Sequence, residues 1–286
     1  MRTEKEIMGL ILNTAKEDER IRAVVMVGSR ANAACPKDIF QDYDIGYIVN
    51  DVVPFYNKPD YIKPFGELLM LQMPETMRGS ANDGHFGYLM QFTDGNRIDL
   101  SFNTLERHLK EIGEEPVKVL LDKDNALPPS RESDTAYHVK PPTENDYFSC
   151  CNDFWWCSMN VAKGIWRDEL PYAMEMYNKV VRDELHCMLD WYIGMTNDFK
   201  ISTGKSGKYY KNHLSEKRYD MYRASFPSAD YDAVWYSLFK AGDLFRGVAL
   251  GVGIHFGFTY PHDDDRKVCA HLKHIRKLPK DAKGIY

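Results

Sequence analysis

Three aspartates in the first part of the chain have the types and spacing of a divalent-metal site. Asp42 and Asp44 are separated by one residue in a segment that alternates polar and apolar residues. On a strand, both carboxylates therefore point to one face. Two such groups lie about 6–7 Å apart and repel each other unless a cation lies between them. Mg²⁺ prefers carboxylate oxygens, commonly with substrate phosphates as further ligands. Asp99, on a later predicted strand, adds a third carboxylate, and together the three predict a metal site.

A Gly-Ser pair precedes these aspartates and predicts a phosphate-binding turn. Gly28 and Ser29 follow the apolar segment 23–27, which is typical of a buried strand. Such a turn offers backbone N–H groups and a hydroxyl to phosphate oxygens. Arg30 comes next and is predicted to contact a phosphate, with an ordinary surface arginine as the alternative. Taken alone, Asp42 and Asp44 would fit a solvated edge strand better than a metal site, and Gly28, Ser29 and Asp99 are what favour the metal site.

The elements expected to position these residues alternate between helix and strand. Thr3 and Glu6 form a capping box that predicts a helix over 4–17. The other expected elements are strands at 21–27, 42–49, 87–92, 97–102 and 117–121 and a short helix at 105–112. We therefore expect a small mixed sheet with helices on one side.

A proline-containing segment at 126–142 marks the expected boundary between two domains. The sequence after it is rich in aromatic residues and poor in strand patterns. Its helical periodicity covers 144–164, 171–193, 208–224 and 229–250. The predicted fold class is α+β, with an N-terminal mixed-sheet domain at 1–135 followed by a C-terminal helical domain at 136–286.

The motifs that carry the predicted site resemble those of a known superfamily. Val27–Asn32, Asp42–Ile45 and Arg97–Leu100 look like the nucleotidyltransferase superfamily of DNA polymerase beta. Met188–Gly194 and Gly204–Tyr209 are similar to aminoglycoside 6-adenylyltransferases, the streptomycin-modifying family. The resemblance therefore spans both halves of the chain.

This resemblance implies a reaction, its cofactor and its setting. The chain would transfer AMP from ATP to the 6-hydroxyl of streptomycin, release pyrophosphate and so inactivate the antibiotic, which is a form of antibiotic resistance. Asp42, Asp44 and Asp99 would hold two Mg²⁺ ions that bridge the phosphates, and Asp99 would be the general base for the acceptor hydroxyl. The N-terminal part would be the nucleotidyltransferase catalytic domain, with the active cleft between it and a helical domain that binds substrate and nucleotide.

A lysine-containing turn in the second half is the further candidate for nucleotide binding. Gly204-Lys205-Ser206 is not a P-loop, because that motif needs a first glycine where Phe199 stands and a strand leading into the loop. Lys205 and Lys208 would offset the charge of a polyphosphate. A solvated basic loop before a helix is the alternative.

Aromatic and acidic residues are the candidates for holding a cationic substrate. Trp155 or Trp156 would offer a ring face, and Asp83, Asp183 and Glu184 would offer carboxylates. Guanidinium groups lose water on binding and need such partners in exchange. Asp183 and Glu184 cannot face the substrate equally, because neighbours on a helix lie about 100° apart. The alternative for most of the aromatic residues is a place in the core of the helical domain.

Composition and charge exclude several other classes of protein. The net charge of −5 argues against a nucleic-acid binder, and no apolar run reaches the ~18–20 residues of a membrane span. The N-terminus lacks an apolar signal region, so we expect a cytoplasmic protein. Its six cysteines lack zinc-site spacing and are expected to be reduced thiols. The expected partners are ATP and a cationic aminoglycoside, without a membrane or nucleic acid.

Two other functions stay open at the level of sequence. The same chemistry could act on another acceptor, such as a protein side chain or an RNA end, and the negative net charge disfavours the RNA. A non-catalytic nucleotide-binding regulator could share the fold. Such a regulator would typically have lost a carboxylate, and Asp42, Asp44 and Asp99 are all present.

Overall fold

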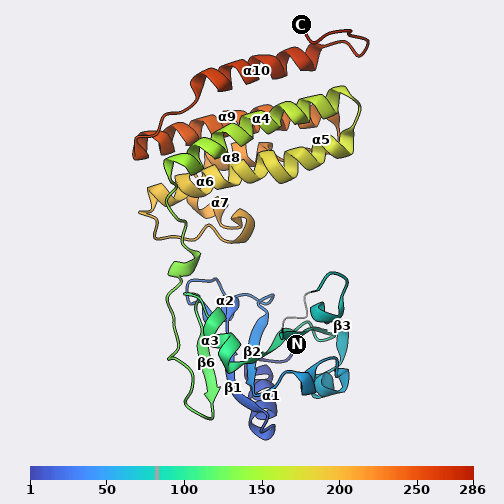
Figure 1. Ribbon diagram of the computed structural model, residues 1–286, viewed down its shortest axis with the longest axis vertical. Helices are drawn as coiled ribbons and strands as arrows, with labels where there is room; N and C mark the ends of the chain where they lie inside the picture. The colour runs from blue at the N-terminus through green and yellow to red at the C-terminus, as the bar shows by residue number, and fades with distance from the viewer. Residues whose placement is uncertain (81–83) are drawn as a thin grey trace. The chain divides into compact units, whose positions relative to one another are not determined.

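The computed structural model describes residues 1–80 and 84–286, which divide into two compact units, Met1–Ala136 and Tyr137–Tyr286 (Figure 1). Each unit has a hydrophobic core of its own. The described residues of the first unit form a sheet with helices, and those of the second form helices and their connections. The predicted α+β fold is thereby confirmed.

A mixed sheet organises the first unit. Its strands are β1 (Ile21–Met26), β2 (Tyr43–Val49), β3 (Leu68–Gln72), β4 (Phe86–Phe92), β5 (Arg97–Thr104) and β6 (Lys118–Asp122). In the described part of the chain they form one six-stranded sheet in the order β3-β4-β5-β2-β1-β6. β2 and β5 run parallel, whereas the other neighbouring pairs are antiparallel. β3 was not predicted from the sequence.

Alternation along the two central strands separates an apolar face of the sheet from a polar one. The apolar face contributes to one core the residues Tyr43, Ile45 and Tyr47 of β2 and Ile98, Leu100 and Phe102 of β5. Phe102 stacks on Phe55 with ring centroids 4.5 Å apart, and removal of such a buried ring costs roughly 3–5 kcal/mol. Packing of this layer therefore fixes the register that leaves Asp44 and Asp99 on the other face.

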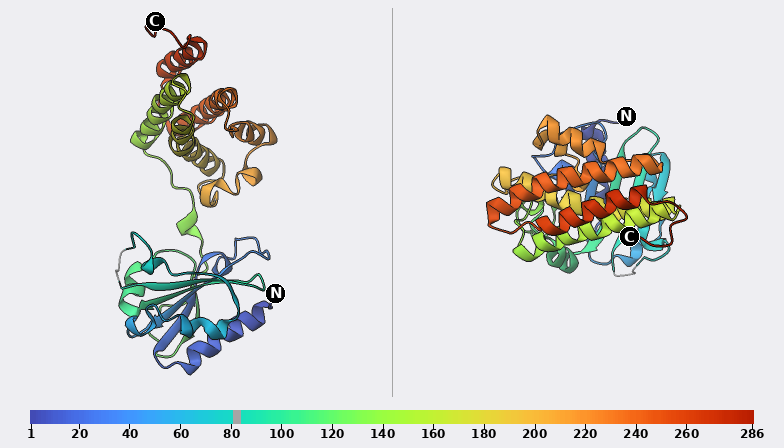
Figure 2. Two further views of the ribbon diagram at one scale, coloured as in Figure 1. Left: turned by 90° about the vertical axis from the view of Figure 1, so that its right-hand side faces the viewer. Right: turned by 90° about the horizontal axis from the view of Figure 1, so that it is seen from above.

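Helix α1 (Glu4–Glu17) covers the apolar face. Its capping box forms as predicted, with the Thr3 hydroxyl accepting from the Glu6 N–H and the Glu6 side chain accepting from the Thr3 N–H. The buried Tyr47 hydroxyl donates to the Ile11 carbonyl at 2.6 Å, which ties the helix to β2. The 3-10 helices of this unit are η1 (Val53–Phe55), η2 (Pro59–Phe65) and η3 (Pro74–Thr76), and η2 lies beside α1 (Figure 2).

The opposite face of the sheet is covered in part. Helix α3 (Leu105–Glu111) is capped by Thr104, and Leu105 and Ile112 pack on a small core that contains Val25 and Ile48. The expectation of helices on one side only was therefore wrong. β1 and β2 carry apolar side chains on both faces of the sheet, so other elements must shield each face from water.

Helices that pack around aromatic residues make up the second unit. They are α4 (Glu144–Trp166), α5 (Leu170–Met176), α6 (Arg182–Thr196), α7 (Tyr210–His213), α8 (Glu216–Ala224), α9 (Tyr231–Phe256) and α10 (His262–Lys277), with a 3-10 helix η6 (Lys205–Gly207). Another 3-10 helix, η4 (Thr135–Tyr137), lies across the boundary between the two units. Phe154 of α4 stacks on Phe245 of α9 at 3.8 Å. The left view of Figure 2 shows these helices nearly end-on. No helix in the described part of the chain is long and apolar enough to cross a membrane.

Two predicted helices of this unit are interrupted. A π-helical turn, Tyr177–Val181, separates α5 from α6, where one helix over 171–193 was expected. The helix expected over 208–224 is divided because Ser215 caps a new helix, its hydroxyl accepting from the Arg218 N–H. α10 was not predicted from the sequence.

Candidate active site

The parallel pairing of β2 and β5 brings two of the predicted carboxylates together. Asp44 and Asp99 are register partners on adjacent strands, and Asp42 directly precedes β2. Burial raises the pKa of the Asp44 carboxyl to about 6, and the negative charges of Asp99 and Asp42 add to the rise. Burial also raises the pKa of Asp42, although the nearby Arg97 opposes this. The site therefore holds negative charge that favours a bound cation.

Gly28, which follows the end of β1, lies against the side chain of Asp44. It begins the single helical turn α2 (Gly28–Ala31), and its φ of +68° is a conformation that glycine adopts readily. A Cβ atom at this position would lie 2.1 Å from Asp44 Oδ2. The Val27 N–H donates to the Asp44 carbonyl at 3.0 Å. The Gly28-Ser29 turn and the carboxylate therefore lie in direct contact, as their order in the sequence suggested.

Arg97 is the cation that lies against these carboxylates. Its Nε and Nη2 atoms donate to Asp99 Oδ1 and Oδ2 at 2.8 and 2.7 Å, and Nε lies 3.5 Å from Asp42 Oδ2. With the side-chain conformations of this structure, residues 1–80 and 84–286 contain no group of three Asp, Glu, His or Cys side chains that could hold a metal ion. The sequence analysis did not predict this ion pair.

The donor set nevertheless fits Mg²⁺. It consists of hard carboxylate oxygens on or next to neighbouring strands, and burial, with the charges of Asp99 and Asp42 added, raises the pKa of Asp44. Asp42, Asp44 and Asp99 are the residues that would hold the metal.

Arg30 has partners of a kind that the sequence did not predict. Its Nε and Nη2 atoms donate to the backbone carbonyls of Asp42 and Gln41 at 3.1 and 3.0 Å. Its guanidinium lies 3.8 Å from the centroid of the Tyr43 ring, and 13% of the side chain is exposed. These contacts fix the backbone at residues 41–43, where the chain enters β2. Arg30 therefore positions Asp42 through its backbone and not through its carboxylate.

A second polar group on the same face of the sheet was not predicted. His85 Nδ1 lies 3.0 Å from Asn103 Oδ1, and His85 Nε2 lies 3.4 Å from Glu75 Oε1. The other Glu75 oxygen accepts from the Gly87 N–H at 3.0 Å. Asn103 continues the row of β5 residues that begins with Asp99, because both lie at alternate positions of one strand. Periodicity gave no signal for Glu75, which lies outside the strands.

In the second unit, the turn with Lys205 and Lys208 has a defined conformation. Gly204 and Gly207 have φ values of +73° and +72°, and a Cβ at Gly207 would lie 2.4 Å from the Tyr210 ring. Tyr210 is in turn fixed by its hydroxyl, which lies 2.7 Å from Asp190 Oδ1 on α6. Both lysines are exposed. The turn is therefore anchored to the helices while its two cations face solvent.

The two predicted tryptophans lie in different environments. Trp155 is 3% exposed, packs edge-on against Phe154 and donates from Nε1 to the Tyr260 hydroxyl, so it belongs to the core. The prediction that Trp155 could offer a free ring face was wrong. Trp156 is 61% exposed on α4.

The predicted acidic residues differ in the same way. Asp183 is exposed in the first turn of α6, and Glu184 is half-buried. Burial raises the pKa of the Glu184 carboxyl, and the charges of Asp153 and Asp183 add to the rise. Asp153 of α4 therefore lies close enough to Glu184 of α6 to act on its charge, and Trp156 follows Asp153 by one turn of α4. Asp83, the remaining candidate, lies outside the described residues.

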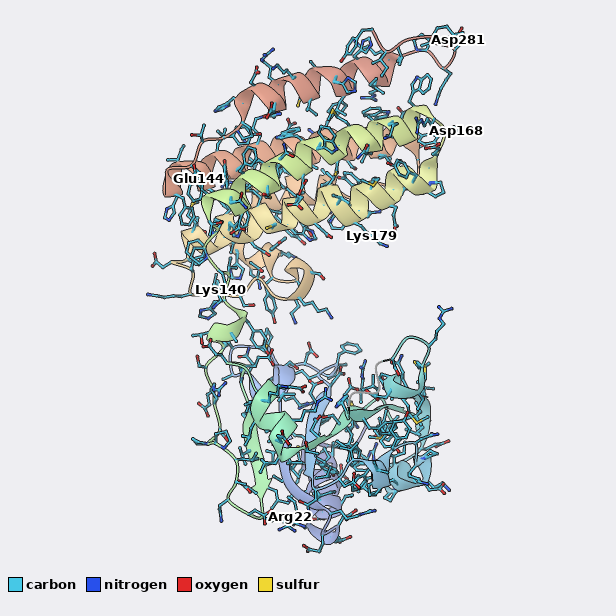
Figure 3. The ribbon with its side chains drawn as sticks, in the orientation of Figure 1. Arg22, Lys140, Glu144, Asp168, Lys179 and Asp281 are labelled. Carbon is cyan, nitrogen blue, oxygen red and sulfur yellow. The ribbon has the colours of Figure 1, made fainter. Side chains whose placement is uncertain are left out.

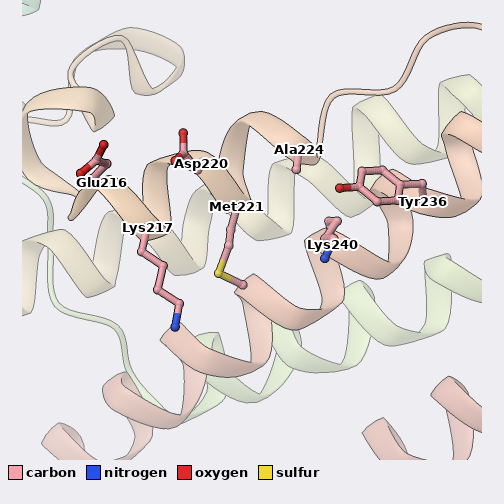
Figure 4. Close-up of a pocket in the computed structure, with 7 residues that line it drawn as sticks. All are labelled: Glu216, Lys217, Asp220, Met221, Ala224, Tyr236 and Lys240. Carbon is pink, nitrogen blue, oxygen red and sulfur yellow. The ribbon is translucent and has the colours of Figure 1, made fainter.

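A recess of about 510 Å³ lies between α8 and α9. It is lined by Glu216, Lys217, Asp220, Met221, Ala224, Tyr236 and Lys240 (Figure 4). None of the site residues predicted from the sequence is among these seven.

Comparison with known proteins identifies the family. The sequence pattern of the family described as streptomycin adenylyltransferase matches residues 1–275. The chain belongs to the streptomycin adenylyltransferase family. It is 38% identical to an aminoglycoside 6-adenylyltransferase of Campylobacter jejuni, over 93% of each chain. It is 36% identical to one of Bacillus subtilis (strain 168), over 93% of this chain and 95% of the other. A crystal structure of a Bacillus subtilis aminoglycoside 6-adenyltransferase aligns with 97% of this chain and 100% of that chain, at 31% identity and a TM-score of 0.49.

Membership of the streptomycin adenylyltransferase family makes the protein an enzyme, a nucleotidyltransferase. The geometry agrees with this chemistry, which needs carboxylates beside a turn that binds phosphate. In this structure the Asp44 carboxylate lies directly beside Gly28.

Arg30→Lys is expected to lower kcat about tenfold and to leave the KM for the nucleotide nearly unchanged. Lysine keeps the positive charge but cannot donate to both carbonyls and stack on Tyr43 at once. Steady-state kinetics with varied nucleotide measures both constants. Arg20→Lys, at an arginine paired with Asp18 outside the site, is the control. A raised KM with unchanged kcat would instead support the phosphate contact expected from the sequence.

Proposed function

We propose that the protein transfers AMP from ATP to a hydroxyl of an aminoglycoside, the 6-hydroxyl of streptomycin, and releases pyrophosphate. The observation that carries this proposal is the contact of the Gly28-Ser29 turn with Asp44, next to Asp99. The names of the family and of its relatives support the class of acceptor. The modified drug would be inactive, so the enzyme would confer antibiotic resistance.

The residues of the first unit have separate roles in this proposal. Backbone N–H groups of Gly28 and Ser29, with the Ser29 hydroxyl, hold phosphate oxygens of ATP. Asp42, Asp44 and Asp99 would hold two Mg²⁺ ions, which when bound neutralise charge on the phosphates. Arg30 keeps Asp42 in place through the backbone.

Asp99 takes the proton of the acceptor hydroxyl as general base. The hydroxyl oxygen then forms a bond to the α-phosphorus in line with the leaving group. The bond between that phosphorus and the oxygen that bridges to the β-phosphorus breaks, and pyrophosphate leaves with the bonding electrons. A carboxylate next to the attacking oxygen suits this role because the strands hold it in a fixed position.

We also propose that Lys205 and Lys208 contact the polyphosphate. Replacing both by alanine is expected to weaken Mg·ATP binding about tenfold or more and to affect drug binding less, because two exposed positive charges are lost. Isothermal titration calorimetry measures both affinities. The matched control is Lys217→Ala/Lys240→Ala, which removes two lysines from the recess between α8 and α9. Unchanged Mg·ATP affinity in Lys205→Ala/Lys208→Ala would reject the contact.

The drug is proposed to bind as a cation at Trp156, Asp183 and Glu184. Replacing each by alanine is expected to weaken drug binding about two- to fivefold, the effect of one cation–π contact or one exposed ion pair. Drug affinity should also fall as salt rises. Tyr236→Ala, at another exposed ring, is the control. Affinity that is flat with salt and unaltered in all three variants would show that the acceptor binds elsewhere.

The direct test of the proposed function is to incubate the pure protein with ATP, Mg²⁺ and streptomycin and to measure pyrophosphate. Release that depends on streptomycin, with AMP on the drug by mass spectrometry, is the expected result. A panel of other aminoglycosides, a protein and an RNA separates the alternative acceptors. Pyrophosphate release with another acceptor and none with streptomycin would contradict the proposal.

A further inference from the structure

Arg97 forms the tightest contact of the candidate site. Both residues of the pair lie on one face of β5, because Arg97 and Asp99 are alternate residues of that strand. The guanidinium makes two parallel bonds, one to each Asp99 oxygen, at 2.8 and 2.7 Å. The 3.5 Å contact with Asp42 extends the pair to a second carboxylate. One arginine thus faces the oxygens that a metal ion would need.

The environment of the Arg97 side chain allows it to move away from the carboxylates of Asp99 and Asp42. Its side chain is 41% exposed, whereas that of Arg30 is 13% exposed and bound to backbone carbonyls and a ring. In the described part of the chain, the Arg97 guanidinium pairs with the carboxylates of Asp99 and Asp42 alone. Arg30 therefore has a fixed structural place, and Arg97 is held only by the charges that a metal would also seek.

We propose that Arg97 is an internal counter-cation that competes with the divalent metal for Asp99 and Asp42. A metal that binds these oxygens displaces the guanidinium, which then carries an unpaired charge beside the metal. Phosphates of the nucleotide neutralise that charge, so nucleotide and metal each strengthen the binding of the other. This inference rests on the metal site of the proposed function and adds to it a reason for binding metal weakly until nucleotide arrives.

The test measures metal binding without turnover. The affinity for Mn²⁺ is determined from the electron paramagnetic resonance signal of the free ion, with and without the non-reactive analogue α,β-methylene-ATP. Arg97→Met removes the charge and keeps an apolar side chain. Arg22→Met is the matched control, because Arg22 pairs through Nε and Nη2 with both oxygens of Asp124. Arg22 lies at the end of β1 away from Gly28 (Figure 3).

Without nucleotide, Arg97→Met is expected to bind Mn²⁺ about fivefold more tightly than the wild type, the fold-change that a partly exposed ion pair supports. Arg22→Met is expected to bind it as the wild type does. The analogue should tighten Mn²⁺ binding less in Arg97→Met than in the wild type. Thermal unfolding checks that each variant folds. If Arg97→Met does not fold, Arg97→Lys replaces it in the test, with an expected gain of about twofold in Mn²⁺ affinity.

Two results would overturn the inference, and Asp44→Asn separates them. If Asp44→Asn abolishes Mn²⁺ binding but Arg97→Met and Arg97→Lys bind it no more tightly than the wild type, Arg97 is no competitor and the metal site stands. If Mn²⁺ binding is insensitive to Asp44→Asn, the metal site of the proposed function is wrong and the inference falls with it.

Discussion

Asp44→Asn is expected to lower turnover at least about 10²-fold while making the metal-free protein more stable. Turnover falls because a metal ligand is lost from a site whose groups act together. The pKa of Asp44 is raised to about 6, so the folded state holds this proton more tightly than the unfolded chain does. The wild type therefore loses stability as pH rises from about 4 to about 6, and it stays less stable above that range.

The gain in unfolding free energy at pH 7 should be about 1–2 kcal/mol, after allowance for the partial exposure of Asp44 to solvent. Urea unfolding in EDTA across pH 4–8 measures it, and kinetics with Mg²⁺ measures turnover. Asp99→Ala should lose at least as much turnover. Asp124→Asn, at the distant pair with Arg22, should change turnover little. Turnover like that of the wild type in Asp44→Asn or Asp99→Ala would remove the basis for this catalytic site.

Gly28→Ala is expected to lower turnover about 10²-fold. Its Cβ would lie 2.1 Å from Asp44 Oδ2, so the carboxylate or the turn must move, and displacement of about 1 Å in a catalytic group has this scale of effect. The backbone strain at φ +68° also costs roughly 1–2 kcal/mol of stability.

Gly95→Ala separates these two effects. Gly95 has a φ of +89°, and no atom lies within 4 Å of the Cβ that alanine would add. This variant should lose similar stability in thermal unfolding but keep its turnover. Equal turnover in Gly28→Ala and Gly95→Ala would show that the contact with Asp44 has no catalytic importance.

Local signals predicted the elements that carry the site. The capping box of Thr3 and Glu6 placed α1 at its observed bounds, because the cap is a short-range interaction visible in the sequence. β3 was missed because it is apolar without alternation and leaves Leu69 and Met70 exposed. α10 was missed although Asp263–Asp265 in its first turn are a signal for a helix start.

The site itself could be predicted in part. The sequence placed Asp99 on a later strand, but only the topology shows that this strand lies parallel to β2, with Asp44 as the partner of Asp99. Neighbours on a helix face directions about 100° apart, so Trp155 and Trp156 could not lie in the same environment. The structure shows which of the two is buried, Trp155. The partners of Arg30 and Arg97 depend on side-chain conformation, which a pattern of residue types does not specify.

The parallel pairing of β2 and β5 also determines where this chain can change in length. The segment between Val49 and Arg97 leaves the two strands and returns, so its length does not set their register. An insertion at Gly79, where an added Cβ would meet no atom within 4 Å, should be absorbed locally. A deletion of one residue within β5 before Asp99 would turn that carboxylate into the core and an apolar side chain outward. Natural variation in length should therefore concentrate in the loops of the connecting segment and avoid the strands of the sheet.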